Sequence, residues 1–593
     1  MPAGLTAYIL FFLTGSLFLF CCLTGGDLAE QGNIVWTGAY TVKTLAVSLL
    51  GGALLGGLVC TLFLWKDSRQ ISGQKSAREI WCIRPWKIFA GSLGLIVLSW
   101  LPTYLAYYPA ICSYDMPVQT GQVVEQYYID HHPIAHTFLL KCFMKLGSNV
   151  LGSVTAGIGV FAFLQQLFLA ASLACGVFFL YKNGVRRLWL ILVQLWCMLY
   201  PFHWYMGVSI TKDTVFTGFF VLQLLSLYDL LRETEGTEHR LRKEIAFLLT
   251  TVGMILFRNN GKYAFLVLLA VLLLFFLFGK KHRRYFGRIL LWAVGALLLG
   301  NMLLSAIFRI SGAEQGDKRE MLSLPIQQLA RTMIYHGGVG VLPEDDNTME
   351  ETDKALINDF ILNEGYKSYN PGISDPVKRS TNTYVARYRA KEFLSTWLGL
   401  LAEYPGDYLN AALAVDAGYL YPNDESHAYI NVEDDRVGRG YIQTYWEEDT
   451  MNARGIYKAS KWEWLLNRLE QWADKNAYLD LPVLKYLFVP GVWLWFYLLL
   501  LARLVRNGQY RQCIPLALIG GYFVTLLLGP TVQLRYIYPV ISAFPFVLIQ
   551  GNKYDRTEET GLEGQSSETP ENSREGKNVG QQRMGERNCN ERI

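Results

Sequence analysis

Long apolar runs constrain the fold of this chain more than any other feature. A transmembrane helix needs about 20 mostly apolar residues, and twelve stretches approach that length. They cover residues 4–24, 44–65, 88–108, 154–181, 187–206, 213–231, 244–258, 262–279, 288–308, 485–503, 511–529 and 536–551. With 52% hydrophobic residues in 593, the composition excludes a large soluble enzyme. The runs predict an all-α polytopic membrane protein with about twelve transmembrane helices.

Basic residues indicate how these helices are oriented. Lysine and arginine gather in the loops 66–87, 182–187, 232–243, 279–288 and 503–511. Short loops of this composition stay on the cytoplasmic side of a membrane. Twelve alternating spans place all of these loops, and both termini, in the cytoplasm of a cell whose plasma membrane holds the protein. Residues 1–24 lack a basic n-region and a small-residue cleavage site, so we expect a retained helix there.

The same topology divides the chain into regions. Residues 1–308 form a transmembrane module whose first large outer loop, 109–153, is the candidate catalytic loop. The block 309–484 is too long for a loop, and its apolar residues recur at helical spacing in 384–403 and 461–472. It predicts a mainly helical extracytoplasmic domain. Residues 485–551 return to the membrane, and the polar tail 552–593 is expected to be disordered and cytoplasmic.

Charge and cysteine content exclude other classes of partner. The net charge of +4 is modest, and the basic residues lie in short loops beside apolar runs, which is typical of membrane topology and not of nucleic-acid binding. The ten cysteines show neither zinc-site spacing nor a disulfide framework.

The candidate functional residues are ionisable groups at the ends of apolar runs. Asp115, Lys212, Asp213, Arg258 and Arg535 all fall on the predicted outer side. Charges beside hydrocarbon are costly and mark functional sites in membrane proteins. One carboxylate among several cations would suit a lipid donor that carries phosphate.

Asp115 is the candidate catalytic residue. A carboxylate on the outer loop could act as a general base toward an acceptor hydroxyl. The alternative is a helix N-cap, because Met116-Pro117 follows and proline is common at a helix start.

The histidines of the same loop leave three alternatives open. His131 and His132 precede Pro133, and His136 follows. The imidazoles could contact phosphate or sugar, bind a divalent metal together with Asp115 or Asp130, or make structural hydrogen bonds. No cofactor is certain from the sequence, and a divalent metal is one of these alternatives.

The remaining candidates open or close predicted helices. Lys212 and Asp213 begin a span, where Thr211 could cap the helix and Asp213 would suit its dipole. Arg258 and Asn259 belong to a polar hairpin in which Arg258 could bind phosphate. Arg535 and Tyr536 lie at an outer mouth, where the arginine could instead extend its side chain to the membrane surface.

The order of these motifs resembles the GT-C class of membrane glycosyltransferases, which use polyprenyl-phosphate sugars. The shared features are a large first outer loop with an aspartate, Lys-Asp at an outer helix start, an Arg-Asn-Asn-Gly hairpin, a late external domain and a terminal Arg-Tyr-x-x-Pro-like turn. More closely, Tyr-Pro-x-x-x-Ser-Tyr-Asp115, His132-Pro133, Ser209-Ile210-x-Lys212-Asp213 and Leu322-Ser323-x-Pro325-x-Gln327-Gln328 resemble an uncharacterised family of bacterial polytopic proteins placed beside that class.

The resemblance implies a function. Asp115 would be the catalytic base or would orient the acceptor. Lys212, Arg258 and Arg535 would bind the donor phosphate, and His131 and His132 would line the donor pocket. The protein would move a sugar from a polyprenyl-phosphate donor to a cell-envelope polymer or lipid. Met116 stands where GT-C first loops often carry a second acidic residue, so the resemblance does not extend to metal dependence.

Two other functions remain open on the sequence. A transporter or flippase for a lipid-linked intermediate would be expected to show internal repeats and charges near the membrane midplane; the chain shows no repeat, and its charges lie at one face. A non-catalytic assembly partner could bind envelope polysaccharide through tryptophans that stack on sugar rings, of which the candidates are Trp446, Trp462, Trp464 and Trp472.

Overall fold

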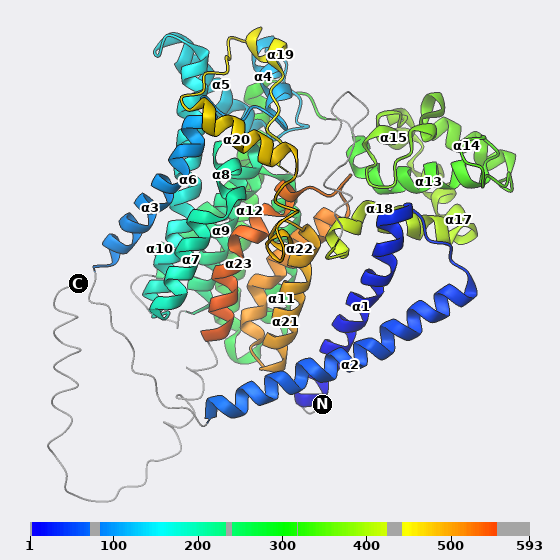
Figure 1. The fold of residues 1–593 in the computed structure, drawn as a ribbon, viewed down its shortest axis with the longest axis horizontal. Helices are drawn as coiled ribbons and strands as arrows, with labels where there is room; N and C mark the ends of the chain where they lie inside the picture. Colours follow the sequence, from blue (N-terminus) through cyan, green and yellow to red (C-terminus); the bar gives the residue numbers. More distant parts are fainter. Residues whose placement is uncertain (1–2, 72–83, 233–239, 317, 424–441, 554–593) are drawn as a thin grey trace, which may run out of the picture.

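The protein is a bundle of long apolar helices with shorter helices gathered at one end (Figure 1). The structure, a computed structural model, describes residues 3–71, 84–232, 240–316, 318–423 and 442–553. These residues form no β-strand, only isolated bridges. All but the first two residues of the predicted tail lie outside them. The all-α fold predicted from the sequence is therefore confirmed for this part of the chain.

Eight helices of the described residues are long and apolar enough to cross a membrane, which makes this a multi-pass membrane protein by helix length and composition. They lie on α1 (Ala3–Gln31), α2 (Gly38–Ile71), α3 (Pro85–Ala106), α6 (Val154–Lys182), α9 (Lys212–Leu231), α11 (Asn259–Phe278), α12 (Arg283–Ser311) and on η6 (Tyr510–Gln512) joined to α22 (Cys513–Leu527).

The other four predicted spans also coincide with helices, but with shorter or more charged ones. Run 187–206 is divided at Pro201 into α7 (Arg187–Leu199) and α8 (Pro201–Val208), because a residue before proline disfavours helical backbone angles. The others correspond to α10 (Arg240–Phe257), α21 (Pro490–Arg506) and α23 (Leu534–Lys553). Twelve spans therefore remain a prediction.

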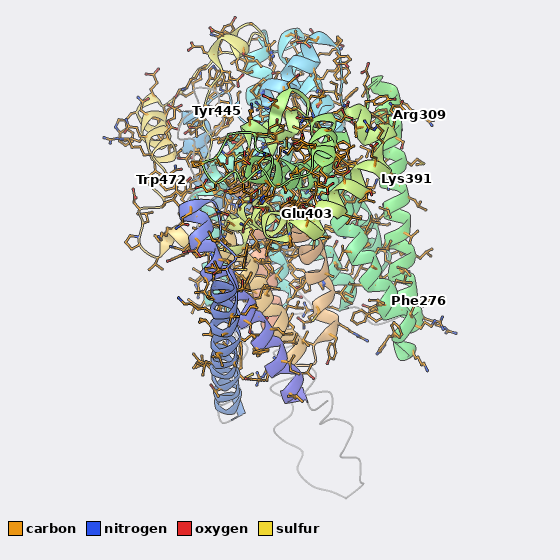
Figure 2. All side chains as sticks on the ribbon, turned by 90° about the vertical axis from the view of Figure 1, so that its right-hand side faces the viewer. Phe276, Arg309, Lys391, Glu403, Tyr445 and Trp472 are labelled. Atoms are coloured by element: carbon orange, nitrogen blue, oxygen red, sulfur yellow. The ribbon has the colours of Figure 1, made fainter. Side chains whose placement is uncertain are left out.

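Several short helices lie together at one end of the bundle. Helices α4 (Met116–Glu125), α5 (Ile134–Asn149), α19 (Glu448–Asn452) and α20 (Glu463–Asp474) lie at one end, which we call the site end (Figure 1). Figure 2 shows Arg309 at that end together with Lys391 and Glu403, and Phe276 at the opposite end. The basic turn η1 (Lys280–His282) follows Phe276 closely in the chain and therefore lies at that opposite end.

The predicted block 309–484 separates into two parts. Residues between Ile326 and Tyr408 form a hydrophobic core of their own. They come from α13 (Ser323–His336), α14 (Glu351–Phe360), η3 (Leu362–Ser368), α15 (Asp375–Arg379), α16 (Thr383–Tyr388), α17 (Ala390–Glu403) and α18 (Pro405–Leu420), preceded by η2 (Lys318–Leu322). In contrast, Ala473 and Tyr478, which follow or end α20, share the core of the membrane bundle with η5 (Leu484–Leu487) and α21.

A pair of glycines allows α5, a helix of the candidate loop, to pack closely against α6, the helix that follows it. Gly157 of α6 faces Gly147 of α5, and a Cβ atom on Gly157 would come within 2.8 Å of the Gly147 Cα atom and also strike the Phe143 carbonyl oxygen. Backbone atoms cannot move aside as a flexible side chain can. The two helices can therefore approach this closely only because neither residue has a side chain.

We expect Gly157→Ala to destabilise the protein by about 1–3 kcal/mol, the usual cost of overpacking. The measurement is the midpoint of SDS-induced unfolding in mixed micelles. Gly94→Ala is the matched control, because Gly94 lies in α3 and its added Cβ would meet no atom within 4 Å. An equal loss in both variants would contradict the contact's importance.

Candidate functional site

Two chain segments far apart in sequence meet at the site end. Ile111 donates its backbone N–H to the Val208 carbonyl at 3.0 Å, and Ile210 donates to the Ile111 carbonyl at 3.1 Å. This parallel bridge aligns the segment before Asp115 with the segment before Lys212. As a result, both side chains emerge at the same place.

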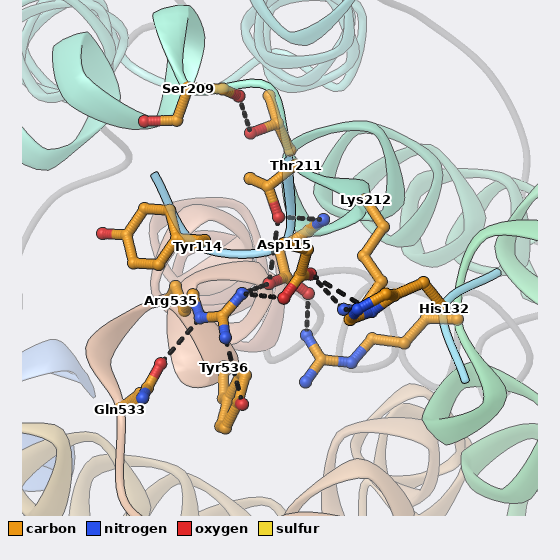
Figure 3. A network of polar contacts seen from close by, with 12 residues as sticks. Tyr114, Asp115, His132, Ser209, Thr211, Lys212, Gln533, Arg535 and Tyr536 are labelled. Atoms are coloured by element: carbon orange, nitrogen blue, oxygen red, sulfur yellow. Dashed lines mark hydrogen bonds and ion pairs between the residues drawn. The ribbon is translucent and has the colours of Figure 1, made fainter. Parts of the chain in front are cut away.

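Asp115 occupies the N-cap position of α4, but its side chain makes no capping hydrogen bond. It forms an ion pair with Lys212, and Oδ1 lies 3.2 Å from the Arg535 guanidinium. Figure 3 shows the carboxylate between these two cations. Of the two sequence alternatives, the position is that of a cap and the interactions are those of a buried charged site.

Asp213 forms the second half of the same network. The Arg535 Nη1 atom that reaches Asp115 also lies 3.3 Å from Asp213 Oδ2, and Arg258 pairs with Asp213 Oδ1. Thr211 caps α9 as predicted, since its hydroxyl accepts the Asp213 N–H at 3.3 Å. The network thus joins the start of α4, the start of α9, the α10–α11 junction and the start of α23.

The buried network carries an excess of positive charge. Asp115, Asp213, Arg258 and Arg535 are each at most 7% exposed. Three cations, with Lys212 as the third, face two carboxylates, so one positive charge is uncompensated. Burial raises the pKa of Asp115, but the positive charges of Arg535 and Lys212 outweigh burial and hold that pKa well below its usual value. The carboxylate is therefore ionised in this arrangement.

Histidine 132 borders the network as a neutral imidazole. Its Nδ1 atom lies 3.5 Å from Lys212 Nζ and 3.9 Å from Asp115 Oδ2. Burial lowers the pKa of His132 to about 3, although the nearby Asp115 opposes that shift. His131 is exposed, with its ring 4.6 Å from that of His132. No three His, Cys, Asp or Glu side chains among the described residues are grouped as a metal site.

His136 makes a structural contact. Its Nδ1 atom lies 2.9 Å from Gln119 Oε1, and the Gln119 amide donates to Thr137 at 3.0 Å. Because that amide is the donor, Oε1 is the acceptor and the imidazole is assigned its proton on Nδ1. Burial lowers the pKa of His136 to about 4. The structural alternative therefore describes this histidine.

Aromatic rings enclose the two arginines. The centroid of the Tyr536 ring lies 4.8 Å from both the Arg258 and the Arg535 guanidinium carbon, and the Tyr114 ring lies 4.6 Å from that of Arg535. Cation–π contacts of this kind stabilise a desolvated arginine. Gln533 Oε1 accepts from Arg535 Nε at 2.6 Å. Arg535 is thus held inside the protein and does not extend to the surface.

Asn259 lies away from these contacts. Its side chain is exposed at the start of α11. Its neighbour Asn260 lies 3.5 Å from Arg258 Nε and donates to the Thr525 hydroxyl at 3.0 Å. The sequence offered no means of choosing between two adjacent asparagines, because which one faces inward depends on where α11 begins.

A segment from the second half of the chain holds the loop that bears Asp115. The Gln443 carbonyl accepts the Ser113 hydroxyl at 2.7 Å, and the Gln443 N–H donates to the Tyr114 hydroxyl at 3.0 Å. Tyr114 itself has a left-handed φ of 59°, a strained conformation that persists when surrounding contacts enforce it. Nothing in the sequence around Gln443 marked it as part of the site.

The fold and the site define a multi-pass α-helical membrane protein with a buried ion-pair network at one end of its bundle. Residues 123–565 match a family of unknown function (DUF6020), and the chain belongs to that family. The matched region contains Lys212, Arg258 and Arg535 and begins shortly after Asp115. No curated protein and no solved structure matches the chain.

Proposed function

We propose that this protein transfers a sugar from a polyprenyl-phosphate donor to an acceptor of the cell envelope. The observation that supports the proposal is the buried network with three cations and two carboxylates. Buried charge without compensation is costly, and a phosphate placed there would supply the missing negative charge. The site end would face the outside of the plasma membrane, with both termini and the basic loops in the cytoplasm.

The ion pairs also suggest how the donor would activate Asp115. In the resting arrangement, Lys212 and Arg535 hold the pKa of this carboxyl low, which makes it a weak base. Donor phosphate would compete for both cations, and its negative charge would raise that pKa toward the working range. Catalytic power would therefore appear only when the donor is bound.

The reaction would be an inverting transfer. Asp115 takes the proton of an acceptor hydroxyl while the oxygen of that hydroxyl forms a bond to the anomeric carbon of the sugar. The bond between that carbon and the phosphate oxygen breaks, and polyprenyl phosphate leaves with the electron pair. Lys212, Arg258 and Arg535 stabilise the negative charge that grows on the leaving phosphate. His132, neutral beside Lys212, would contact the donor.

Binding of the leaving group tests the proposal directly. We expect polyprenyl phosphate to raise the melting temperature of the full-length protein in nanodiscs, because a ligand that binds the folded state stabilises it. Polyprenol, which lacks the phosphate, should have no effect. Lys212→Met should weaken polyprenyl phosphate binding about tenfold or more, the scale of a hydrogen bond to a charged group.

Lys243→Met provides the matched control. Lys243 also lies near an aspartate, with Asp229 Oδ1 3.6 Å away, but at the other end of α9. The Lys243→Met variant should bind polyprenyl phosphate with the same affinity as the unaltered protein. Equal stabilisation by polyprenol and polyprenyl phosphate would reject a phosphate site.

A further inference from the structure

A cavity at the site end is separate from the charged network. It has a volume of about 500 Å³ and lies between α8 and α20. Its walls include Trp204, Tyr205, Arg468, Gln471, Trp472 and Lys475, and none of the residues of the ion-pair network lines it. Two cations and three aromatic rings therefore surround one hollow.

Helix α20 has the character of a helix that lies at a membrane surface. Leu466 and Ala473 pack into the core of the bundle. Trp464 lies 63% exposed on the same helix, and Trp462, 45% exposed, directly precedes it. Figure 1 shows α20 crossing the bundle beside α8 near the site end. Amphipathic helices with tryptophan and basic residues lie in the interface between lipid headgroups and acyl chains.

Stacked aromatic rings form one wall of the cavity. The Tyr205 and Trp472 rings are parallel within 6°, with centroids 6.1 Å apart. The Tyr205 hydroxyl also donates to the Leu469 carbonyl at 2.9 Å, which ties α8 to α20. This wall is apolar and fixed in position, as the upper part of an acyl chain or a glycerol backbone would require.

The two cations of the cavity have no ion-pair partner among the residues that the structure describes. Arg468 and Lys475 are seven residues apart, or about two helical turns, so they point from the same side of the chain. Neither forms an ion pair with any residue that the structure describes. The nearby carboxylates are engaged elsewhere, Glu470 with Lys458 at 2.8 Å and Asp474 with the Thr444 hydroxyl at 3.3 Å.

We infer that this cavity binds the headgroup of an anionic diacyl phospholipid. The two unpaired cations would hold the phosphate, and the aromatic wall would contact the apolar part of the lipid. A free anion would not require the aromatic wall, and a neutral saccharide would not require the cations. The inference does not depend on sugar transfer, because it concerns a different cavity and different residues.

Lipid retention by the full-length protein tests the inference. Native mass spectrometry after titration with phosphatidylglycerol or phosphatidylcholine is expected to show preferential retention of phosphatidylglycerol. The double variant Arg468→Gln/Lys475→Gln should lose about tenfold or more of that affinity, given the usual contribution of a basic residue near an anionic surface. Arg468→Lys/Lys475→Arg, which keeps both charges, should retain it.

The same titration includes a control variant and tests two alternative ligands, inorganic phosphate and polyprenyl phosphate. Lys458→Gln removes a neighbouring cation that already has a carboxylate partner, and phosphatidylglycerol retention should be unchanged. No preference for phosphatidylglycerol, or an equal loss in Lys458→Gln, would overturn the inference. Displacement by millimolar inorganic phosphate would show a free-anion site instead, and displacement by equimolar polyprenyl phosphate would show a site for the lipid substrate.

Discussion

Asp115→Asn is expected to lower the rate of sugar transfer by about 10²- to 10⁴-fold, the usual contribution of a general base. The amide keeps the shape of the side chain but cannot accept the acceptor's proton. The affinity for the donor lipid should not fall with the rate. In the resting protein, the Asp115 carboxylate occupies Lys212 and Arg535, so its neutralisation should leave the affinity for polyprenyl phosphate equal or higher.

The measurement is release of polyprenyl phosphate from a panel of polyprenyl-phosphate hexoses and pentoses, with affinity measured separately. Glu125→Gln is the control, because Glu125 is an exposed carboxylate at the other end of α4. It should transfer sugar at the normal rate. Normal turnover in Asp115→Asn would remove Asp115 from the chemistry, and a loss of affinity without a loss of rate would assign it to binding alone.

Asp213→Asn is expected to produce the largest loss of stability, about 3–5 kcal/mol, the cost of removing one partner from a buried ion pair. Asp213 is fully buried and contacts both Arg258 and Arg535. Without its charge, Arg258 loses its carboxylate partner, and Arg535 keeps only Asp115. The midpoint of SDS-induced unfolding measures the loss.

Asp229→Asn is the control that separates the effect of burial on stability from the effect of removing a charge. Asp229 lies in the same helix and also faces a cation, Lys243 at 3.6 Å, but its side chain is 27% exposed. An ion pair of this kind contributes at most about 1 kcal/mol. In addition, Asp213→Asn combined with Arg258→Leu should cost less than the sum of the two single variants, because the residues interact directly. Additive costs would contradict the coupling.

The apolar runs were sufficient to predict the long apolar helices. All twelve predicted runs coincide with helical segments, because spanning length and apolar composition are local properties. The break at Pro201 could also have been expected, since proline acts on the residue directly before it. Whether the shorter helices cross the membrane is not decided by sequence, because length alone does not distinguish a tilted span from a buried helix.

The charged residues were grouped from the sequence by predicted topology, and not by any evidence that they are in contact. Asp115, Lys212, Arg258 and Arg535 were grouped because each lies within a few residues of the end of an apolar run on the same predicted side, and the structure places all four in one network. Topology predicts a shared face but not contact. The sequence could not predict that Arg535 would bridge two aspartates, nor that Gln443 would hold Tyr114.

The sequence by itself determined the class of protein, the approximate positions of its helices and the face on which its costly charges gather. These follow from hydrophobicity and loop charge, which act over tens of residues. Only the tertiary structure decided which charges pair, that Asn260 and not Asn259 faces Arg258, and that α8 and α20 enclose a cavity. Most of these contacts join residues tens to hundreds of positions apart, and even the orientation of Asn260 depends on its distant partner Thr525. Their geometry depends on how whole helices pack.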